Sequence, residues 1–117
     1  MIGQVGADGT PYITLHIAGK DWITVIDTGF NSDFELPVGL FHDVVIEYVG
    51  PGMVQLAGGR IEEEEFYRVR LPFDGRLVEV EASFVKSDSL LLGTRMMHDY
   101  RLTIHFPDRL VELIRIK

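Results

Sequence analysis

The stretch of sequence that is most informative about the fold is Val25-Ile26-Asp27-Thr28-Gly29-Phe30 (VIDTGF). The segment Trp22–Ile26 is rich in β-branched and aromatic residues, which is typical of a strand. Such a strand would carry Asp27 directly into a loop. Thr28 adds a hydroxyl group that can brace the loop, and Gly29 allows backbone or substrate to approach closely. The motif therefore predicts a carboxylate presented at the end of an apolar strand, although Asp and Gly are also frequent in ordinary turns.

The residues before this motif predict a strand and a hairpin. From Tyr12 to Ala18 apolar and polar side chains alternate, which is the period of a β-strand. Gly19-Lys20-Asp21 is a plausible tight turn, so Trp22–Ile26 is expected to pair back onto that strand. Ile2–Val5 is a further short strand at the start of the chain.

The residues after the motif repeat the same pattern of short strands and turns. Gly50-Pro51-Gly52 should interrupt a strand, and the glycines of Ala57-Gly58-Gly59 and Asp74-Gly75 mark hairpin ends. Further strands are expected at Val44–Val49, Met53–Leu56, Arg60–Phe73, Leu77–Val85, Leu90–Leu92, Arg101–Phe106 and Leu110–Ile116. One helix is expected from Thr94 to Tyr100, with Thr94 as its N-cap. The pattern predicts an all-β fold, a small barrel or sandwich.

Length and composition limit the possible classes of protein. A chain of 117 residues with 46% apolar and 25% charged residues predicts a single globular domain, residues 1–117. It has no cysteine, which excludes disulfides, thiolate metal sites and cysteine nucleophiles. The net charge of −7 and the scattered basic residues argue against nucleic acid as a partner. No apolar run is long enough to span a membrane, and the first ten residues predict no signal peptide, so a cytoplasmic protein is expected.

Three motifs in a fixed order together resemble the retropepsin-like aspartic proteases, the single-lobed family of retroviral proteases and their bacterial relatives. The motifs are VIDTGF at Val25–Phe30, QLAGGRI at Gln55–Ile61 and LLLGTRMM at Leu90–Met97. The resemblance extends from about Pro11 to Phe106. It implies a closed β-barrel with one short C-terminal helix and a flap hairpin.

The resemblance also implies an activity and roles for individual residues. Asp27 matches the catalytic aspartate, Thr28 the residue that braces the paired loops across a dimer, and Gly29 the glycine whose carbonyl receives a substrate N–H. Ala57, Gly58 and Gly59 match the flap tip that closes over substrate. Leu91-Leu92-Gly93 matches the packing support behind the catalytic loop.

The implied chemistry needs two aspartates, whereas the chain has one Asp-Thr-Gly motif. Two carboxyls about 3 Å apart share one proton, so that one acts as base and the other as acid. A homodimer would supply the second Asp27 through a two-fold axis. No metal and no cofactor are expected. The partners expected are a peptide or protein substrate and a second copy of the chain. The terminal segments Ile2–Val5 and Leu110–Ile116 are expected to be the strand edges that pair between subunits.

The chain departs from the family pattern at three positions. Phe30 follows the motif where a small residue is usual, so its ring is expected to contact substrate. Asn31 stands where retroviral enzymes have an aspartate, and Thr94 where they have an arginine. The ion pair of those enzymes cannot form here. Asn31 is also expected to contact substrate.

Other polar groups have simpler interpretations. Glu62–Glu65 is interpreted as a solvated strand edge, and its functional alternative is selection of basic peptides or weak cation binding. The four histidines have no helical metal spacing and are interpreted as surface or structural residues. Asp33 and Asp99 could also be catalytic carboxylates, but neither follows a strand as Asp27 does. The sequence therefore predicts an aspartic endopeptidase. The alternative is a non-catalytic peptide-binding or protein-interaction module with the same fold.

Overall fold

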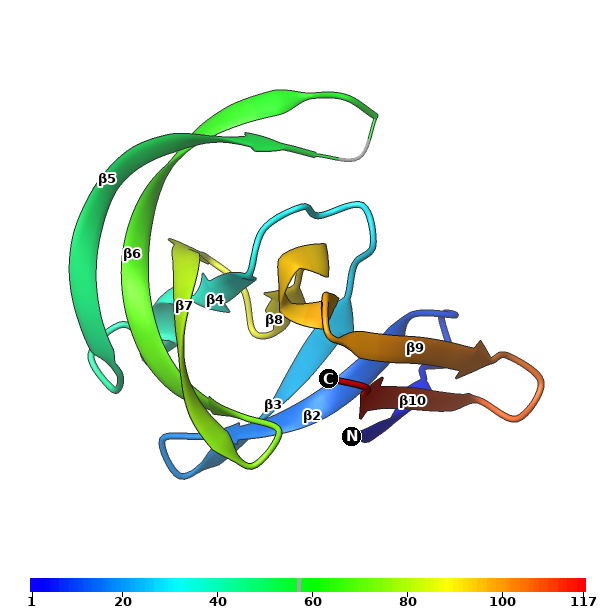
Figure 1. Cartoon of the computed structure of the whole chain (residues 1–117). Helices are drawn as coiled ribbons and strands as arrows, with labels where there is room; N and C mark the ends of the chain where they lie inside the picture. Colours follow the sequence, from blue (N-terminus) through cyan, green and yellow to red (C-terminus); the bar gives the residue numbers. More distant parts are fainter. Residues whose placement is uncertain (57) are drawn as a thin grey trace.

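The computed structural model describes residues 1–56 and 58–117 and shows an all-β chain (Figure 1). The described residues form ten strands and two short 3-10 turns. In chain order these are β1 (Ile2–Val5), β2 (Pro11–Ile17), β3 (Lys20–Ile26), β4 (Phe34–Pro37), η1 (Val38–Leu40), β5 (Val45–Gln55), β6 (Ile61–Phe73), β7 (Arg76–Val85), β8 (Leu90–Leu92), η2 (Thr94–Met97), β9 (Tyr100–His105) and β10 (Leu110–Arg115). The predicted all-β class is confirmed. None of the described helical segments has the length and apolar character that a membrane span requires.

The strands form one sheet with the order β5-β6-β7-β4-β8-β3-β2-β1-β10-β9. Two neighbouring pairs, β3–β8 and β4–β7, are parallel, and the others are antiparallel. The prediction of a closed barrel is wrong, because β5 and β9 lie at opposite ends of this order and no pairing joins them within the described residues. The reason is that β5 has a single buried side chain, Val54, and curves away from the core together with the first half of β6 (Figure 1). The second half of β6 stays in the core through Val69, Leu71 and Phe73.

Ile2–Val5 and Leu110–Ile116 were predicted to be the strand edges that pair between subunits, and their placement at an edge of the sheet is wrong. β1 pairs with β2 on one side and with β10 on the other. β10 in turn lies between β1 and β9. The two ends of the chain therefore satisfy each other's backbone hydrogen bonds, and the open edge at this end of the sheet belongs to β9.

The predicted helix over Thr94–Tyr100 is replaced by the 3-10 turn η2, which ends at Met97. The N-cap is Gly93 and no side chain caps the turn, so Thr94 does not have the expected capping role. Tyr100 cannot continue a helix because it pairs with Arg115 at the start of β9. Strand pairing thus overrides the helix propensity of the methionines.

Gly50-Pro51-Gly52 does not interrupt a strand as predicted. β5 continues from Val45 to Gln55 with a shift of register between Tyr48 and Gly50. Gly50 takes φ +141°, which favours glycine. Pro51 fits because β5 is an edge strand paired only with β6, so a missing N–H breaks no second ladder. The other predicted hairpins, β2–β3 and β6–β7, are confirmed.

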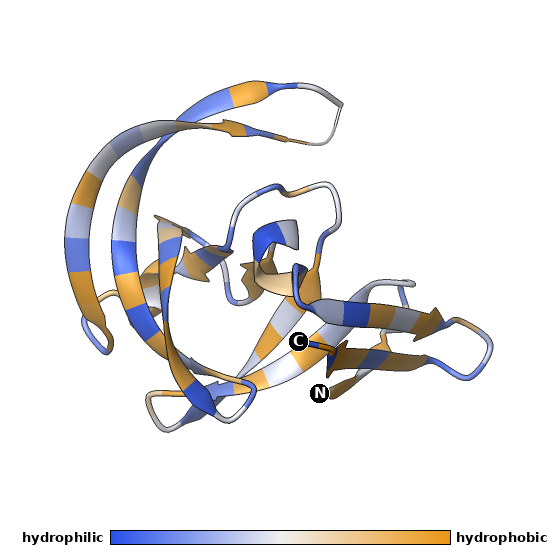
Figure 2. Ribbon diagram, viewed as in Figure 1, coloured by the Kyte–Doolittle hydropathy of each residue, from blue (hydrophilic) through white to orange (hydrophobic). Residues whose placement is uncertain are grey.

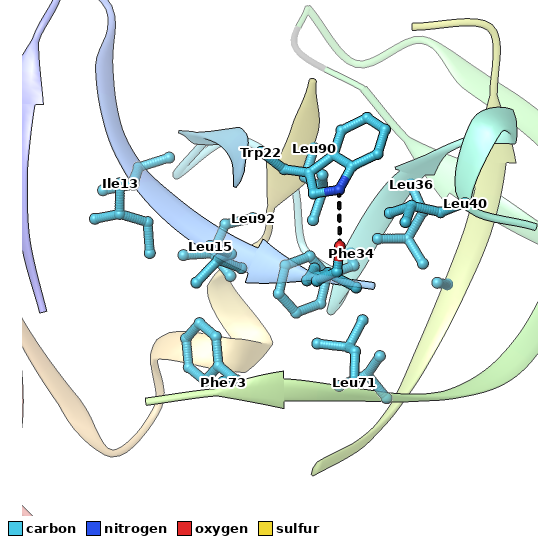
Figure 3. Packing of buried hydrophobic residues seen from close by; sticks show 14 of the residues in the cluster. Ile13, Leu15, Trp22, Phe34, Leu36, Leu40, Leu71, Phe73, Leu90 and Leu92 are labelled. Atoms are coloured by element: carbon cyan, nitrogen blue, oxygen red, sulfur yellow. Dashed lines mark hydrogen bonds between the residues drawn. The ribbon is translucent and has the colours of Figure 1, made fainter. Parts of the chain in front are cut away.

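The core consists of two clusters of buried side chains. The larger lies between the folded halves of the sheet and contains Leu15, Leu71 and Leu92 around the Phe34 and Phe73 rings (Figure 3). The two rings meet edge to face at 5.9 Å. The smaller cluster contains Phe30, Val54 and Phe66, which come from the loop after β3 and from the β5–β6 hairpin. Figure 2 shows apolar and polar residues alternating along that hairpin. Because its members come from both segments, the second cluster connects the hairpin to the loop.

Candidate active site

Asp27 lies directly after β3, at the start of a loop that runs to β4. Its N–H donates to the carbonyl of Leu92 (3.0 Å), so the strand pairing of β3 with β8 extends to the aspartate itself. Its Oδ1 accepts the N–H of Gly29 at 2.8 Å, and its carbonyl accepts the N–H of Phe30 at 3.2 Å. Asp27 is half-buried, whereas Thr28 and Gly29 are exposed. The carboxylate is therefore held in a fixed position while the two following residues remain accessible to a partner.

The loop is supported by the segment between β8 and η2. Gly93 donates its N–H to the Asp33 carbonyl (2.9 Å), and Thr94 donates to the Phe30 carbonyl (2.8 Å). A Cβ atom on Gly93 would lie 2.0 Å from the Ser32 carbonyl oxygen, so only glycine fits there. Leu91-Leu92-Gly93 thus has the packing role that was expected.

Asn31 and Thr94 lie next to each other, as the resemblance implied for their positions. The Thr94 hydroxyl donates to Asn31 Oδ1 at 3.4 Å. The sequence ruled out an ion pair at these two positions, and a neutral contact is found there instead. Asn31 is exposed.

In the loop between β3 and β4, Asp33 forms an ion pair. Its Oδ1 lies 3.6 Å from Arg95 Nε, and its Oδ2 accepts the N–H of Glu81 at 2.8 Å. Asp33 was considered as an alternative catalytic carboxylate, whereas these contacts give it a bracing role between the loop and β7. The sequence held no signal for this, because Glu81 lies 48 positions away.

Phe30 is buried, with 2% of its surface exposed, in the cluster with Val54 and Phe66. Close packing extends to Gly52, where a Cβ atom would lie 2.8 Å from the Phe66 ring. In this chain the ring joins the loop to the β5–β6 hairpin. Its contact with a substrate stays a prediction.

The end of the β5–β6 hairpin lies above the Asp27 loop in Figure 1. Gly58 and Gly59 take φ of +85° and +80° and are exposed. The Leu56 N–H donates to the Arg60 carbonyl (2.7 Å), which closes the turn. Ala57, also predicted to contact substrate, lies outside the described residues. Substrate contact by these three residues stays a prediction.

A cavity of about 340 Å³ lies between the loop and the hairpin. Asn31, Ser32, Glu81 and Arg95 line it on the loop side, and Val49–Gln55 and Phe66 line it on the hairpin side. It is large enough for a side chain of a bound peptide. Asp27 is not in its wall, so the cavity flanks the aspartate rather than enclosing it.

The surroundings of the loop are acidic. Burial raises the pKa of Glu35 on β4, and the negative charges of Glu64, Asp27 and Glu62 raise it further. Glu35 is therefore surrounded by like charges from the loop and from β6. In the described chain no three His, Asp or Glu side chains are grouped so that they could hold a metal ion.

No protein-family model matches the chain, and no curated protein sequence matches it. A retropepsin-like aspartic protease from Rickettsia conorii is similar in structure, with a TM-score of 0.64, 16% identity, and coverage of 97% of this chain and 88% of that chain. A foamy viral protease-reverse transcriptase in complex with an RNA/DNA hybrid has a TM-score of 0.60 and 14% identity, and the match covers 80% of this chain but 13% of that chain.

At these identities the likeness concerns the fold. The expectation drawn from the three motifs is confirmed at that level: this chain has the retropepsin-like fold.

Proposed function

We propose that the chain is an aspartic endopeptidase that works as a homodimer. The observation that supports this most is the placement of Asp27. In a retropepsin-like fold it stands at the end of β3, on a loop fixed by Leu92 and Gly93 and covered by a hairpin. A peptide-binding protein without activity has no need for a carboxylate held in this way.

The chemistry requires two Asp27 carboxyls, one from each copy, that share one proton. Repulsion at about 3 Å keeps one carboxyl protonated while the other is ionised, and the pair titrates with two macroscopic pKa values. The ionised carboxylate removes a proton from water, whose oxygen attacks the carbonyl carbon of the peptide bond. The protonated carboxyl donates to the carbonyl oxygen. As the tetrahedral intermediate collapses, the carboxyl that took the proton from water donates it to the nitrogen and the C–N bond breaks. The other carboxylate takes back the proton of the hydroxyl group, which leaves a free acid and an amine and restores the shared proton.

The neighbouring residues are assigned supporting roles. Thr28 is exposed beside Asp27, so its hydroxyl can brace the same loop of a second copy across the two-fold axis. Gly29 accepts a substrate N–H at its carbonyl. Gly58 and Gly59, with Ala57, close over the bound peptide, and Asn31 contacts its side chains. Phe30, whose ring is buried with Val54 and Phe66, holds the hairpin in place above the loop.

The neutral contact between Thr94 and Asn31 supports one alternative function. If the dimer needs a charged pair at the positions of Thr94 and Asn31, this chain would not form it and the two Asp27 carboxyls would not meet. The chain would then be a peptide-binding module without activity. This alternative predicts that peptides bind but are not cleaved.

Digestion of a mixed peptide library from acid to neutral pH tests the proposal. We expect cleavage that a pepstatin-type transition-state mimic inhibits and that Asp27→Asn abolishes, because the amide cannot act as base. Asp21→Asn is the matched control, since Asp21 is exposed in the β2–β3 hairpin and pairs only with His16 among the described residues. Cleavage by the Asp27→Asn protein, or binding without cleavage by the unmodified chain, contradicts the proposal.

A further inference from the structure

The four consecutive glutamates Glu62–Glu65 lie where two strands of the sheet separate. The pairing of β6 with β7 ends at Tyr67 and Ala82. Beyond this point β7 continues beside β4, with Ser83 opposite Glu35, whereas β6 continues beside β5. Figure 1 shows β6 curving away from the upper ends of β4 and β7. A cavity of about 390 Å³ lies between the separated strands.

Two residues that line this cavity each carry a buried polar atom without a hydrogen-bond partner in the described chain. These atoms are Ser83 Oγ and Glu64 Oε2. Ser83 has 2% of its surface exposed. Leaving such a group unpaired in the folded protein costs roughly 1–3 kcal/mol, and more for a charged group. A hydroxyl and a carboxylate left unpaired on two residues that line one cavity indicate a ligand that donates hydrogen bonds.

The remaining walls of the cavity are aromatic and aliphatic. The rings of Phe41, Tyr67 and Phe84 meet edge to face with centroids 5.0–5.4 Å apart. Val38 and Val85 complete the apolar lining. Aromatic faces attract a cation, and apolar walls accept the methylene stem of a long basic side chain.

The charge of the site is negative and unbalanced. Glu64 and Glu65 both line the cavity, and its lining contains no basic residue in the described chain. Glu65 accepts a hydrogen bond from the Tyr48 hydroxyl, so Glu64 is the free carboxylate. A further carboxyl, that of Glu35, lies on β4 opposite Ser83, and its pKa is raised by burial and then by the charge of Glu64. A bound cation would relieve this repulsion.

We propose that the cavity binds the guanidinium side chain of an arginine in a peptide. A guanidinium is planar, has five N–H donors, pairs with a carboxylate through two parallel bonds and stacks on aromatic rings. Glu64 and Ser83 accept its hydrogen bonds, and the aromatic walls contact its stem. A lysine would offer one point charge and no planar face, so it binds more weakly.

Glu35 on β4 lies between this cavity and the proposed catalytic site, because it pairs with Ser83 on β7 and with Leu91 on β8. The next residue of β8, Leu92, accepts the N–H of Asp27. If the proposed function holds, the arginine belongs to the substrate and lies at a fixed number of residues from the cleaved bond. This second statement rests on the proposed function, whereas binding of the side chain does not.

Binding is tested on the Asp27→Asn chain by NMR titration with N-acetyl-arginine amide. We expect saturable shifts of the Ser83 and Phe84 amides, and about tenfold or more weaker binding with N-acetyl-citrulline amide, which has the same shape but no charge. Glu64→Gln should lose the arginine preference by the same factor. Glu63→Gln is the matched control, because Glu63 is exposed on the neighbouring position of β6. The lysine amide should bind more weakly than the arginine amide.

Equal binding of arginine and citrulline, or loss of preference in Glu63→Gln as well as Glu64→Gln, overturns the inference. The peptide-library digest then separates this inference from the proposed function. Cleavage without an arginine preference contradicts the arginine pocket alone. Absence of cleavage with specific arginine binding contradicts the peptidase proposal alone.

Discussion

The Asp27 loop is held by backbone hydrogen bonds to the segment Leu92–Arg95, whereas the outer part of the β5–β6 hairpin is held by side chains alone. In that outer part, residues 49–56 and 58–65, the buried side chain is Val54. The rest of its contact with the loop comes through Phe30 and Phe66. The loop therefore depends on a backbone geometry that a single added Cβ atom can disrupt. The hairpin depends on one small apolar cluster and tolerates change elsewhere.

The largest expected effect is that of Gly93→Ala. Its Cβ atom would lie 2.0 Å from the Ser32 carbonyl oxygen, so the Asp27 loop must move. We expect a loss of about 4 kcal/mol or more in the free energy of unfolding, measured by denaturant titration. The matched variant in the hairpin is Gly58→Ala, which meets no atom within 4 Å and costs about 1–2 kcal/mol because of its positive φ. Equal losses in the two variants would remove the distinction between the regions.

The second-largest effect is expected for Phe30→Ala, because Phe30 belongs to the cluster that joins the Asp27 loop to the β5–β6 hairpin. Truncating a buried phenylalanine costs about 3–5 kcal/mol. We also expect faster hydrogen exchange at the Val54 amide, because the hairpin loses its anchor. Phe106→Ala is the control, since Phe106 is 58% exposed. A Phe30→Ala protein with unchanged stability would instead place the ring in contact with substrate.

A smaller effect is expected when ionic groups of the two regions are removed. Asp33→Ala leaves the Glu81 N–H without its acceptor and Arg95 without its ion pair, which costs roughly 1–3 kcal/mol. Glu62→Ala removes an exposed ion pair with Arg60 in the hairpin and should change stability by less than about 0.5 kcal/mol. Thermal unfolding of both variants measures the difference. A larger loss for Glu62→Ala would show that the hairpin is held by charge.

The smallest effect concerns Glu35, which faces the acidic residues of both regions. Its folded-state pKa is raised by burial first, and then by Glu64, Asp27 and Glu62, above the ordinary value of 4.5. The protonated form is therefore favoured by folding, and this stability is lost as the pH rises through the folded-state pKa. Glu35→Gln should raise the melting temperature at about pH 7 and leave it unchanged at about pH 3. Stabilisation by the same amount at both pH values, or none at pH 7, would contradict this assignment.

The strands and turns could be predicted from the sequence because they depend on local patterns. The alternation of Ile13, Leu15 and Ile17 gave the strand β2, and Asp74-Gly75 gave the β6–β7 hairpin. The closed barrel, the free terminal edges and the helix after Gly93 could not be predicted correctly. Each depends on which strands pair over long distances, such as β1 with β10 or Tyr100 with Arg115.

The candidate site also has one part that the local sequence predicts and another that depends on long-range contacts. The position of Asp27 at the end of an apolar strand could be predicted from the six residues Val25–Phe30. The bracing of Asp33 by Glu81 and Arg95 was not, because it joins three segments that only the fold brings together. The same is true of the cavity beside Glu64, which depends on the separation of β6 from β7.

The claim that two copies share one catalytic water is tested most directly by mixing. A constant amount of unmodified chain is mixed with increasing amounts of Asp27→Asn chain, and cleavage is measured with saturating substrate. We expect activity to fall as mixed dimers replace unmodified ones, whereas the same amounts of Asp21→Asn chain leave cleavage undiminished. Activity that stays constant as Asp27→Asn chain is added would show that one Asp27 acts alone, and the dimeric site would be wrong.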